Sequence, residues 1–302
     1  MGGMRIFGFN SHGGPEVLQH LEVPAPTPGA GEVLIDVRAT SVNPGDLNTR
    51  EGTNDFEVGF PMAFGREAAG TVVAVGEGVS GIEPGQLVFG SSASGHGSFG
   101  EQALLHAPSV TPVPEGLDVQ HAACIPVAYG TALDLIDMLD LKAGERFVVL
   151  GAGGGVGTAV TSLATARGID VIGVASARKK ELVESLGGRH VESGPGWVER
   201  VRAVAEHPVA LFDLVGGDVL REGAELTDRL VSVADKPTVK ELGGTDVPRR
   251  RTREVFGEVA RLLASGKAQV TVSDVLPLSE AAAAVAVVED GHATGKVVVT
   301  VP

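Results

Sequence analysis

The sequence is poor in cysteine, aromatic residues and positive charge. Its 302 residues include one cysteine, one tryptophan and one tyrosine, and aromatic residues make up 4%. A single cysteine, Cys124, excludes an internal disulfide framework and a four-cysteine zinc site. Lys and Arg number 24 against 38 Asp and Glu, which gives a formal net charge of −14. Because nucleic acids are bound by clustered Lys and Arg, this balance argues against a broad nucleic-acid surface.

Long apolar runs are also missing. No run of about 18 apolar residues occurs, and the opening MGGMRIFGFN has no long apolar core. We therefore expect no transmembrane helix, no secretory signal and a cytoplasmic location. With 43% hydrophobic and 21% charged residues, the chain can bury a large core, and its length suits two domains.

The chain changes character along its length. Residues 1–125 alternate turn signals with short β-type runs at 33–40, 70–76 and 86–90, which indicates a mostly β domain. Residues 126–268 alternate strands with helices, which predicts βαβ units and a parallel sheet. Strand-like signals return near residue 269, so we expect 269–302 to complete the first domain.

Individual elements follow from periodicity. In 33–37, Val33, Ile35 and Val37 alternate with Leu34 and Asp36. Further strands are expected at 146–150, 170–175, 211–216, 230–234 and 295–301, and helices at 155–168, 179–188 and 252–267. A last helix is expected after Ser279, with that serine as its cap.

The most informative motif is GAGGGVG, residues 151–157, which lies between an expected strand and an expected helix. A sharp turn, a closely approaching pyrophosphate and tight helix–strand packing all require small residues. Free N–H groups at the helix N-terminus then bind phosphate. The context therefore matches a dinucleotide-binding fingerprint. A tight turn without a ligand is the plainer alternative.

The end of the second strand indicates which dinucleotide binds. NAD-binding proteins of this type place an Asp or Glu there for the ribose 2′-OH. Here Ser176, Arg178 and Lys179 follow the strand instead. A hydroxyl and two cations suit a 2′-phosphate, so we expect NADPH. A solvated, basic start of the next helix is the alternative.

Several stretches around the glycine motif together resemble a known family. They are VNPGD (42–46), PMAFGREAAGTVVAVGEGV (61–79), GSFGEQAL (97–104), IPVAYGTA (125–132) and GKVVV (295–299). In this order they resemble the zinc-independent medium-chain dehydrogenase/reductases of the quinone oxidoreductase-like branch. The resemblance covers nearly the whole chain and implies an α/β protein. A GroES-like, mostly β domain (1–125 and 269–302) would accompany a Rossmann NADPH-binding domain (126–268), with the cofactor between them.

The resemblance also bears on metal binding. Zinc alcohol dehydrogenases hold a catalytic zinc with a Cys and a His-Glu pair in the first domain. The matching positions here are Asn43 and the pair Arg66-Glu67. We therefore expect no metal, and we interpret His96 and His106 as surface residues. Without a Lewis acid, conjugate reduction is the less demanding reaction, because the charge spreads into an enolate or hydroquinone.

The resemblance implies site residues one by one. The predicted catalytic residues are Asn43 and Asp46 near the nicotinamide, Thr131 at its carboxamide side, and Tyr129 as a candidate proton donor. The predicted cofactor-binding residues are Asn43, Thr131, Gly151, Gly153, Gly154, Gly155, Val156, Ser176, Arg178, Lys179, Val215 and Val233. An ordinary Asn-Pro-Gly-Asp turn is the alternative for Asn43 and Asp46, and packing is the alternative for Tyr129.

One segment departs from the family. Relatives place a strand with aromatic residues after the strand at 230–234, where it lines the nicotinamide and joins two subunits. Here KELGGTDVPRRR (240–251) has glycines for aromatics and poor β propensity. A wider pocket, a different dimer edge or ordering upon ligand binding would each fit, so a homodimer rests on analogy. The run RRRTR (249–253) is interpreted as a solvated helix start, with binding of an anionic substrate such as a CoA as the alternative.

The sequence therefore predicts an NADPH-dependent, metal-free oxidoreductase. It would transfer hydride to a quinone or to the β-carbon of an α,β-unsaturated carbonyl, with a small-molecule electrophile as partner and neither nucleic acid nor membrane. Two alternatives stay open: a trans-acting enoyl-thioester reductase of a biosynthetic pathway, and a non-catalytic NADPH-binding protein on the same fold.

Overall fold

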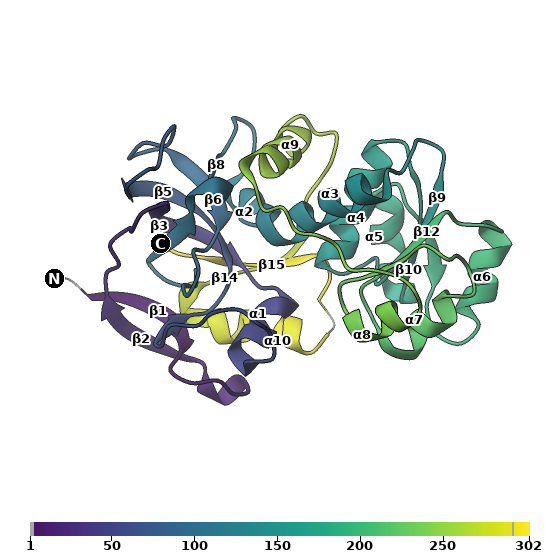
Figure 1. The fold of residues 1–302 in the computed structure, drawn as a ribbon, viewed down its shortest axis with the longest axis horizontal. Helices are drawn as coiled ribbons and strands as arrows, with labels where there is room; N and C mark the ends of the chain where they lie inside the picture. The colour runs from purple at the N-terminus through teal and green to yellow at the C-terminus, as the bar shows by residue number, and fades with distance from the viewer. Residues whose placement is uncertain (1–2, 292) are drawn as a thin grey trace. The chain divides into compact units, whose positions relative to one another are not determined.

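The computed structural model describes residues 3–291 and 293–302 (Figure 1). The chain divides into two compact units. The first unit comprises Met1–Val127, Arg251–Ser265 and Val272–Pro302, and the second unit comprises Ala128–Arg250 and Gly266–Thr271. Among the described residues, no helix has both the length and the apolar character needed to cross a bilayer.

The first unit contains two sheets. The larger has seven strands in the order β14-β15-β3-β5-β6-β8, with β7 paired to β3. Its strands are β3 (Glu32–Ser41), β5 (Glu67–Val75), β6 (Leu87–Ser91), β7 (Gln102–His106), β8 (Thr111–Pro112), β14 (Val272–Pro277) and β15 (Lys296–Thr300). The smaller sheet has the order β2-β1-β4, from β1 (Gly3–Phe9), β2 (Gln19–Pro24) and β4 (Met62–Ala63).

Segments far apart in sequence meet in the larger sheet. β15 runs antiparallel to β3, with Val298 opposite Ser41, and it runs parallel to β14. The apolar residues Val297 and Val299 of β15 are fully buried in the core of the first unit. The strand-like segment after residue 269 is therefore part of the same sheet as β3.

Alternation along β3 explains how this strand is buried. Val33, Ile35 and Val37 face the main core and are at most 3% exposed, as the sequence predicts, whereas Asp36 is exposed. Leu34 faces the other side of the sheet but is also buried, in a small cluster with Ala93 and Leu104. β3 thus has apolar neighbours on both faces.

The helices of the first unit differ from the sequence predictions at three places. They are α1 (Pro44–Glu51), α2 (Val119–Ala122), α9 (Arg253–Ala264) and α10 (Ala281–Glu289). The Asn-Pro-Gly-Asp stretch begins α1 rather than forming an isolated turn. Ser279 does not cap α10, because it lies inside a preceding 3-10 turn, and Glu280 occupies the cap position without a side-chain bond.

The position of α9 also differs from the predicted domain boundary. The helix falls within the first unit, whereas the sequence division placed it with residues 126–268. Its Phe256 ring lies 6.2 Å from the ring of Phe89 in β6, and both side chains are fully buried. The apolar face of the helix, which the sequence predicts correctly, therefore packs against the β-rich unit.

The second unit is a parallel five-stranded sheet with helices, as predicted. The strand order is β11-β10-β9-β12-β13, from β9 (Arg146–Leu150), β10 (Asp170–Ala175), β11 (Arg189–Glu192), β12 (Ala210–Asp213) and β13 (Leu230–Ser232). The helices are α3 (Gly130–Leu139), α4 (Gly155–Ala166), α5 (Lys180–Ser185), α6 (Trp197–Val204), α7 (Gly217–Gly223) and α8 (Lys236–Glu241). β10 and β11 lie on one side of β9, and the later strands β12 and β13 lie on the other, so the direction of strand addition reverses at β9. Ligands of such sheets bind at the carboxyl ends of the strands beside this point.

The divergent segment at 240–251 forms no full strand in the described structure. Residues 236–241 form α8, and only Thr245 pairs with β13, through its N–H to the Leu230 oxygen (3.0 Å) and its oxygen to the Ser232 N–H (3.0 Å). The glycines at 243 and 244 offer no side chains to pack against a neighbouring strand. The poor β propensity predicted for this stretch is confirmed.

The close approach of α4 to the end of β9 makes a stability prediction. A Cβ at Gly157 would lie 2.3 Å from the Gly151 oxygen and 2.7 Å from the Ala152 Cα, and both are backbone atoms. We expect Gly157→Ala to lower the free energy of unfolding by about 1–3 kcal/mol. Urea unfolding followed by the fluorescence of the single, buried tryptophan, Trp197, measures this.

Gly154→Ala is the matched control. A Cβ there would lie 3.6 Å from its nearest neighbour, and the backbone φ of −89° suits alanine. We expect a change in unfolding free energy below about 0.5 kcal/mol. If both variants lost the same unfolding free energy, close packing would not explain the glycine at position 157.

Candidate functional site

The glycine motif of the second unit forms a tight turn between β9 and α4. Gly151 adopts a left-handed φ of +79°, and its N–H and that of Ala152 donate to the Val174 oxygen at 3.0 and 3.2 Å. The chain then turns back, with the Gly154 N–H on the Gly151 oxygen (3.1 Å), and α4 begins at Gly155. The first N–H groups of a helix have no acceptor within the helix, so those of Gly155 and Val156 are suited to a phosphate.

The three polar residues after β10 lie at the same end of the sheet. Ser176 precedes a short 3-10 turn that contains the exposed Arg178 and the half-buried Lys179. The stem of Lys179 crosses the glycine turn so closely that a Cβ at Gly153 would lie 2.2 Å from its Cδ. Burial, followed by the Arg178 charge, lowers the pKa of Lys179. Lys179 therefore lies against the glycine turn, and Ser176 and Arg178 precede it in the chain at the same end of the sheet.

The ends of β12 and β13 complete this end of the second unit. Val215 is 54% exposed, unusually so for a large apolar side chain, and its Cγ2 lies 3.4 Å from the position of a Cβ on Gly151. Val233 is half-buried, and its N–H donates to the Asp213 oxygen at 3.3 Å. Both valines that the sequence predicts as cofactor neighbours thus follow strands at the carboxyl edge.

Asp213 holds this loop in place, and sequence reasoning missed it. Its fully buried carboxylate accepts the N–H of Val215 (2.9 Å), the N–H of Gly216 (2.9 Å) and the hydroxyl of Ser232 (2.7 Å). The sequence does contain a signal for this role. Asp213 ends an apolar strand and is followed two residues later by Val215 and a pair of glycines.

Two other predicted residues are buried within the second unit. Tyr129 has no exposed surface, and its hydroxyl donates to the Gln269 oxygen at 2.8 Å. Thr131 lies on α3 and is 5% exposed. The contacts of Tyr129 are those of a packed side chain with a satisfied hydroxyl.

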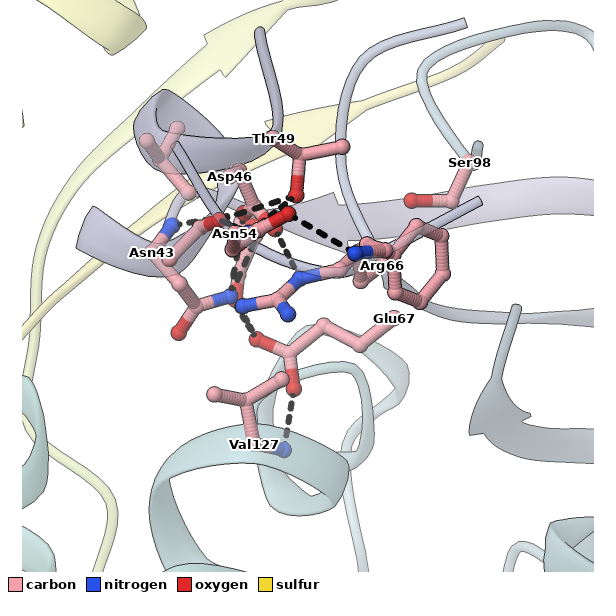
Figure 2. Close-up of polar contacts among 12 residues, drawn as sticks. Asn43, Asp46, Thr49, Asn54, Arg66, Glu67, Ser98 and Val127 are labelled. Atoms are coloured by element: carbon pink, nitrogen blue, oxygen red, sulfur yellow. Dashed lines mark hydrogen bonds and ion pairs between the residues drawn. The ribbon is translucent and has the colours of Figure 1, made fainter. Parts of the chain in front are cut away.

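The first unit contains a buried polar cluster, which we define as Ser41, Asn43, Asp46, Arg66, Glu67 and Lys296. Figure 2 shows Asn43, Asp46 and Arg66 turned toward one another, with Glu67 and Val127 beside them. The residues come from the end of β3, the start of α1, the start of β5 and the start of β15. Five of the six are less than 4% exposed as whole residues or side chains, and the side chain of Arg66 is 15% exposed.

Glu67 is the centre of the cluster. Its Oε1 accepts the Asn43 Nδ2 (2.7 Å), the Lys296 ammonium (3.1 Å) and the Ser41 hydroxyl. Its Oε2 accepts the Val127 N–H at 2.8 Å. Both carboxylate oxygens are therefore committed to protein donors.

The amide of Asn43 is oriented by charges on both sides. Its Oδ1 accepts from the Lys296 ammonium at 2.5 Å, while its Nδ2 faces the Glu67 carboxylate. A flipped amide would set its NH₂ against the ammonium and its oxygen against the carboxylate, so this orientation is fixed. Asn43 is 3% exposed.

Asp46 connects α1 to Arg66. Its Oδ2 accepts the Asn43 backbone N–H at 2.9 Å, as an N-terminal helix cap does, and its Oδ1 accepts the Arg66 Nε at 2.8 Å. Burial raises the pKa of the Asp46 carboxyl, and the Arg66 guanidinium opposes this rise. The sequence predicts a role near the nicotinamide for Asn43 and Asp46, and it gave no signal for the charges of Arg66, Glu67 and Lys296 around them.

Cys124 lies near this cluster and is fully buried. Burial raises the pKa of its thiol to about 12, which disfavours the thiolate form. Its Sγ lies 3.3 Å from the Gln120 oxygen.

The basic run at 249–253 is mostly used in structural contacts. The Arg250 N–H and guanidinium bind Asp134, and its Nη2 binds Asp137 at 2.7 Å. Thr252 caps α9, which begins at Arg253, and the Arg253 Nε donates to the Val110 oxygen at 2.7 Å. The helix start is thus as predicted, but the run is not simply solvated, because Arg249 and Arg250 are held in ion pairs before the helix begins.

Two family models match the chain. The family described as the alcohol dehydrogenase GroES-like domain matches residues 29–115, and the family described as zinc-binding dehydrogenase matches residues 135–299. Together they cover most of both units.

Curated relatives agree with these matches. A quinone oxidoreductase of Sus scrofa is 38% identical over 192 residues, which are 63% of this chain and 57% of that protein. The match thus spans little more than half the length of that relative. A mycocerosic acid synthase-like polyketide synthase of Mycolicibacterium smegmatis is 28% identical over 99% of this chain, which corresponds to 15% of that protein.

Solved structures share the whole fold. A quinone oxidoreductase from Coxiella burnetii superposes with a TM-score of 0.90 at 27% identity, covering 99% of this chain and 100% of its own. A mycobacterial protein solved in complex with NADPH has a TM-score of 0.87 at 28% identity and covers 98% of this chain and 99% of its own.

The buried polar cluster does not fit a zinc ion, despite the family description. Zinc in proteins takes thiolate, imidazole and carboxylate ligands, whereas the cluster contains an amide, a guanidinium and an ammonium beside two carboxylates that are already hydrogen-bonded. Among the described residues, no group of three or more His, Cys, Asp and Glu side chains could hold a metal.

The family models, the relatives and the shared fold therefore confirm what the sequence motifs indicated: the chain belongs to the medium-chain dehydrogenase/reductase superfamily, in its quinone oxidoreductase-like branch.

Proposed function

We propose that this chain is an NADPH-dependent oxidoreductase that transfers hydride to a quinone or to the β-carbon of an α,β-unsaturated carbonyl. The observation that carries the cofactor assignment is the set Ser176, Arg178 and Lys179 after β10, where NAD-binding relatives use a carboxylate. The NADPH held by the mycobacterial structural neighbour supports the same choice for a related chain.

The second unit has the parts that this cofactor needs. Gly154 has no side chain between a pyrophosphate and the start of α4, Gly153 leaves room for the stem of Lys179, and Gly155 and Val156 offer N–H groups there. Arg178 and Lys179 would bind the 2′-phosphate, while Val215 and Val233 would pack against the nicotinamide half. Thr131 of the second unit would contact the nicotinamide carboxamide, as the family resemblance implies. When bound, NADPH supplies a hydride.

The first unit would bind the acceptor beside Asn43 and Asp46. Because the carboxylates of the polar cluster are already hydrogen-bonded and Arg66 offers hydrogen-bond donors, a reaction in which charge spreads into an enolate or hydroquinone suits the cluster better than reduction of an isolated ketone.

An enoyl-thioester acceptor is the second candidate. The 28% identity to a polyketide synthase over 99% of this chain favours it, because such synthases carry their intermediates as thioesters. A panel of quinones, enals, enones and enoyl thioesters, with NADPH absorbance as the readout, separates the candidates. Turnover of thioesters alone would favour this second function, and NADPH binding without any turnover would favour a non-catalytic role.

Arg178→Ala tests the cofactor assignment. One charge-assisted hydrogen bond to the 2′-phosphate is lost, so we expect NADPH affinity to fall roughly 10- to 100-fold. NADH affinity should stay unchanged, because NADH lacks that phosphate. Titration of nicotinamide fluorescence with both cofactors gives the two dissociation constants.

Arg189→Ala is the control for this measurement. It removes the same charge from an exposed position at the amino end of β11, away from the carboxyl edge of the sheet. Its affinity for NADPH should equal that of the unchanged protein. Equal losses of NADPH and NADH affinity in Arg178→Ala, or a preference of the unchanged protein for NADH, would contradict the assignment.

Metal removal tests the other half of the proposal. Because Asn43, Arg66 and Glu67 do not offer a zinc site, treatment with a strong chelator should leave the rate of acceptor reduction unchanged. Rates before and after treatment, with elemental analysis of the same samples, measure this. A lost rate that zinc restores and magnesium does not would overturn the metal-free reaction.

A further inference from the structure

Arg66 is the member of the buried polar cluster with unused hydrogen-bond donors. Its Nε binds Asp46, but neither terminal nitrogen, Nη1 or Nη2, donates to another residue within 3–291 and 293–302. Neither is among the fully buried unpaired atoms of these residues, and the side chain is 15% exposed. Its outer edge therefore offers donors to a molecule outside the unit.

The guanidinium is fixed in place by three contacts. The buried Asp46 carboxylate binds it at 2.8 Å from behind, and the ring of Phe56 lies 5.7 Å from its Cζ, within cation–π range. The third contact is with α1, where a Cβ at Gly45 would lie 2.0 Å from Nη2. Gly45 thus leaves the space in which the guanidinium lies across the first turn of the helix.

The other buried cations of the first unit are not comparable. Lys296 is 2% exposed and bound to Glu67 and Asn43. The Arg50 side chain has no exposed surface, and its Nη2 binds Glu51 and Glu289. Among these cations, Arg66 therefore combines a positive charge, a position fixed by its neighbours and accessible hydrogen-bond donors.

We propose that Arg66 is a catalytic residue that binds the carbonyl oxygen of the acceptor and stabilises the negative charge that develops on it. This inference rests on the proposed function, since it names the group that acts on the acceptor. The acceptor class is a quinone, enone or enoyl thioester, each of which presents a carbonyl oxygen conjugated to the carbon that is reduced.

The electron balance explains why a cation is needed. Hydride addition breaks the C4–H bond of the reduced nicotinamide and forms a C–H bond at the β-carbon. The C=C electron pair moves between the α-carbon and the carbonyl carbon, and the carbonyl pair moves onto oxygen. Nη1 and Nη2 then donate to this oxyanion until a water proton reaches the α-carbon or, in a hydroquinone, the oxygen. A fixed donor aimed at developing charge needs no reorganisation during the step.

Replacing Arg66 tests the proposal. Arg66→Ala should lower kcat/KM for the best acceptor of the panel roughly 10²- to 10³-fold, as loss of an oxyanion donor does elsewhere, with the dissociation constant for NADPH unchanged. Added methylguanidinium should restore part of the rate with saturation, which a purely structural role would not produce. Arg38→Ala, an exposed arginine on β3, should leave both quantities unchanged.

A second variant guards against a folding effect. Arg66→Ala leaves the buried Asp46 without its cation, so Arg66→Ala combined with Asp46→Asn removes the charge at both positions. If Arg66 acts on the acceptor, the melting temperature of the double variant should be closer to that of the unchanged protein than the melting temperature of Arg66→Ala is. The rate of acceptor reduction should still be lost. Recovery of the rate in the double variant would overturn the proposal.

A binding assay separates this inference from the proposed function. The probe is 4-nitrophenolate, whose oxyanion resembles the product enolate, and its absorbance shift is followed with NADP⁺ present. The unchanged protein should bind it, and Arg66→Ala should bind it roughly 10-fold or more weakly. Acceptor turnover with Arg66→Ala within about threefold of normal would overturn the role of Arg66 and leave the function standing. If the unchanged protein reduces no acceptor but binds the probe through Arg66, the oxyanion-binding role of Arg66 stands and the proposed function is wrong. If the unchanged protein and Arg66→Ala bind the probe equally, Arg66 does not form an oxyanion site.

Discussion

The pairing of Glu67 with Lys296 and Asn43 is the constraint on which the first unit depends. Taking a carboxylate and an ammonium out of water costs several kcal/mol per ion unless each finds compensating bonds. Here every bond comes from a different part of the chain: β3, α1, β5 and β15 all end or begin at this point. Removing one partner leaves an uncompensated buried charge, which typically costs about 3–5 kcal/mol. The sheet register and the position of α1 are therefore tied to a single ionic arrangement.

Both units use a buried carboxylate to hold a neighbouring exposed group in place. In the second unit, Asp213 accepts backbone N–H groups and so shapes the loop that exposes Val215 beside the glycine turn. In the first unit, Asp46 binds Nε and so fixes the guanidinium of Arg66. Both carboxylates are buried, while Val215 and the outer edge of Arg66 are exposed to solvent. In both units the buried carboxylate therefore fixes the position of a group at the surface.

Local patterns predicted the second unit well, because strand, turn and helix are specified within a few residues there. The glycine turn joins β9 to α4 and the parallel sheet follows from alternating elements, as predicted. The first unit was harder. Its β-strands were expected, but no helix was predicted at α1, because Asn, Pro, Gly and Asp favour helix starts and turns alike. Lys296 and Glu67 are separated by 229 positions, and no local pattern connects them. The helix at 253–264 is predicted by its amphipathic face, but that face does not specify which unit it packs against.

The pairing of β15 with β3 has a consequence for the order of events during synthesis. Most of the second unit is one continuous run, Ala128–Arg250, so its sheet can assemble as soon as that run has left the ribosome. The first unit begins earlier in the chain, yet β3 has no partner in β15, and Glu67 no ammonium, until residue 296 has been added. The first unit to be started is thus the last to be finished. Glu67 can therefore take up its buried, paired position only after the second unit has been synthesised.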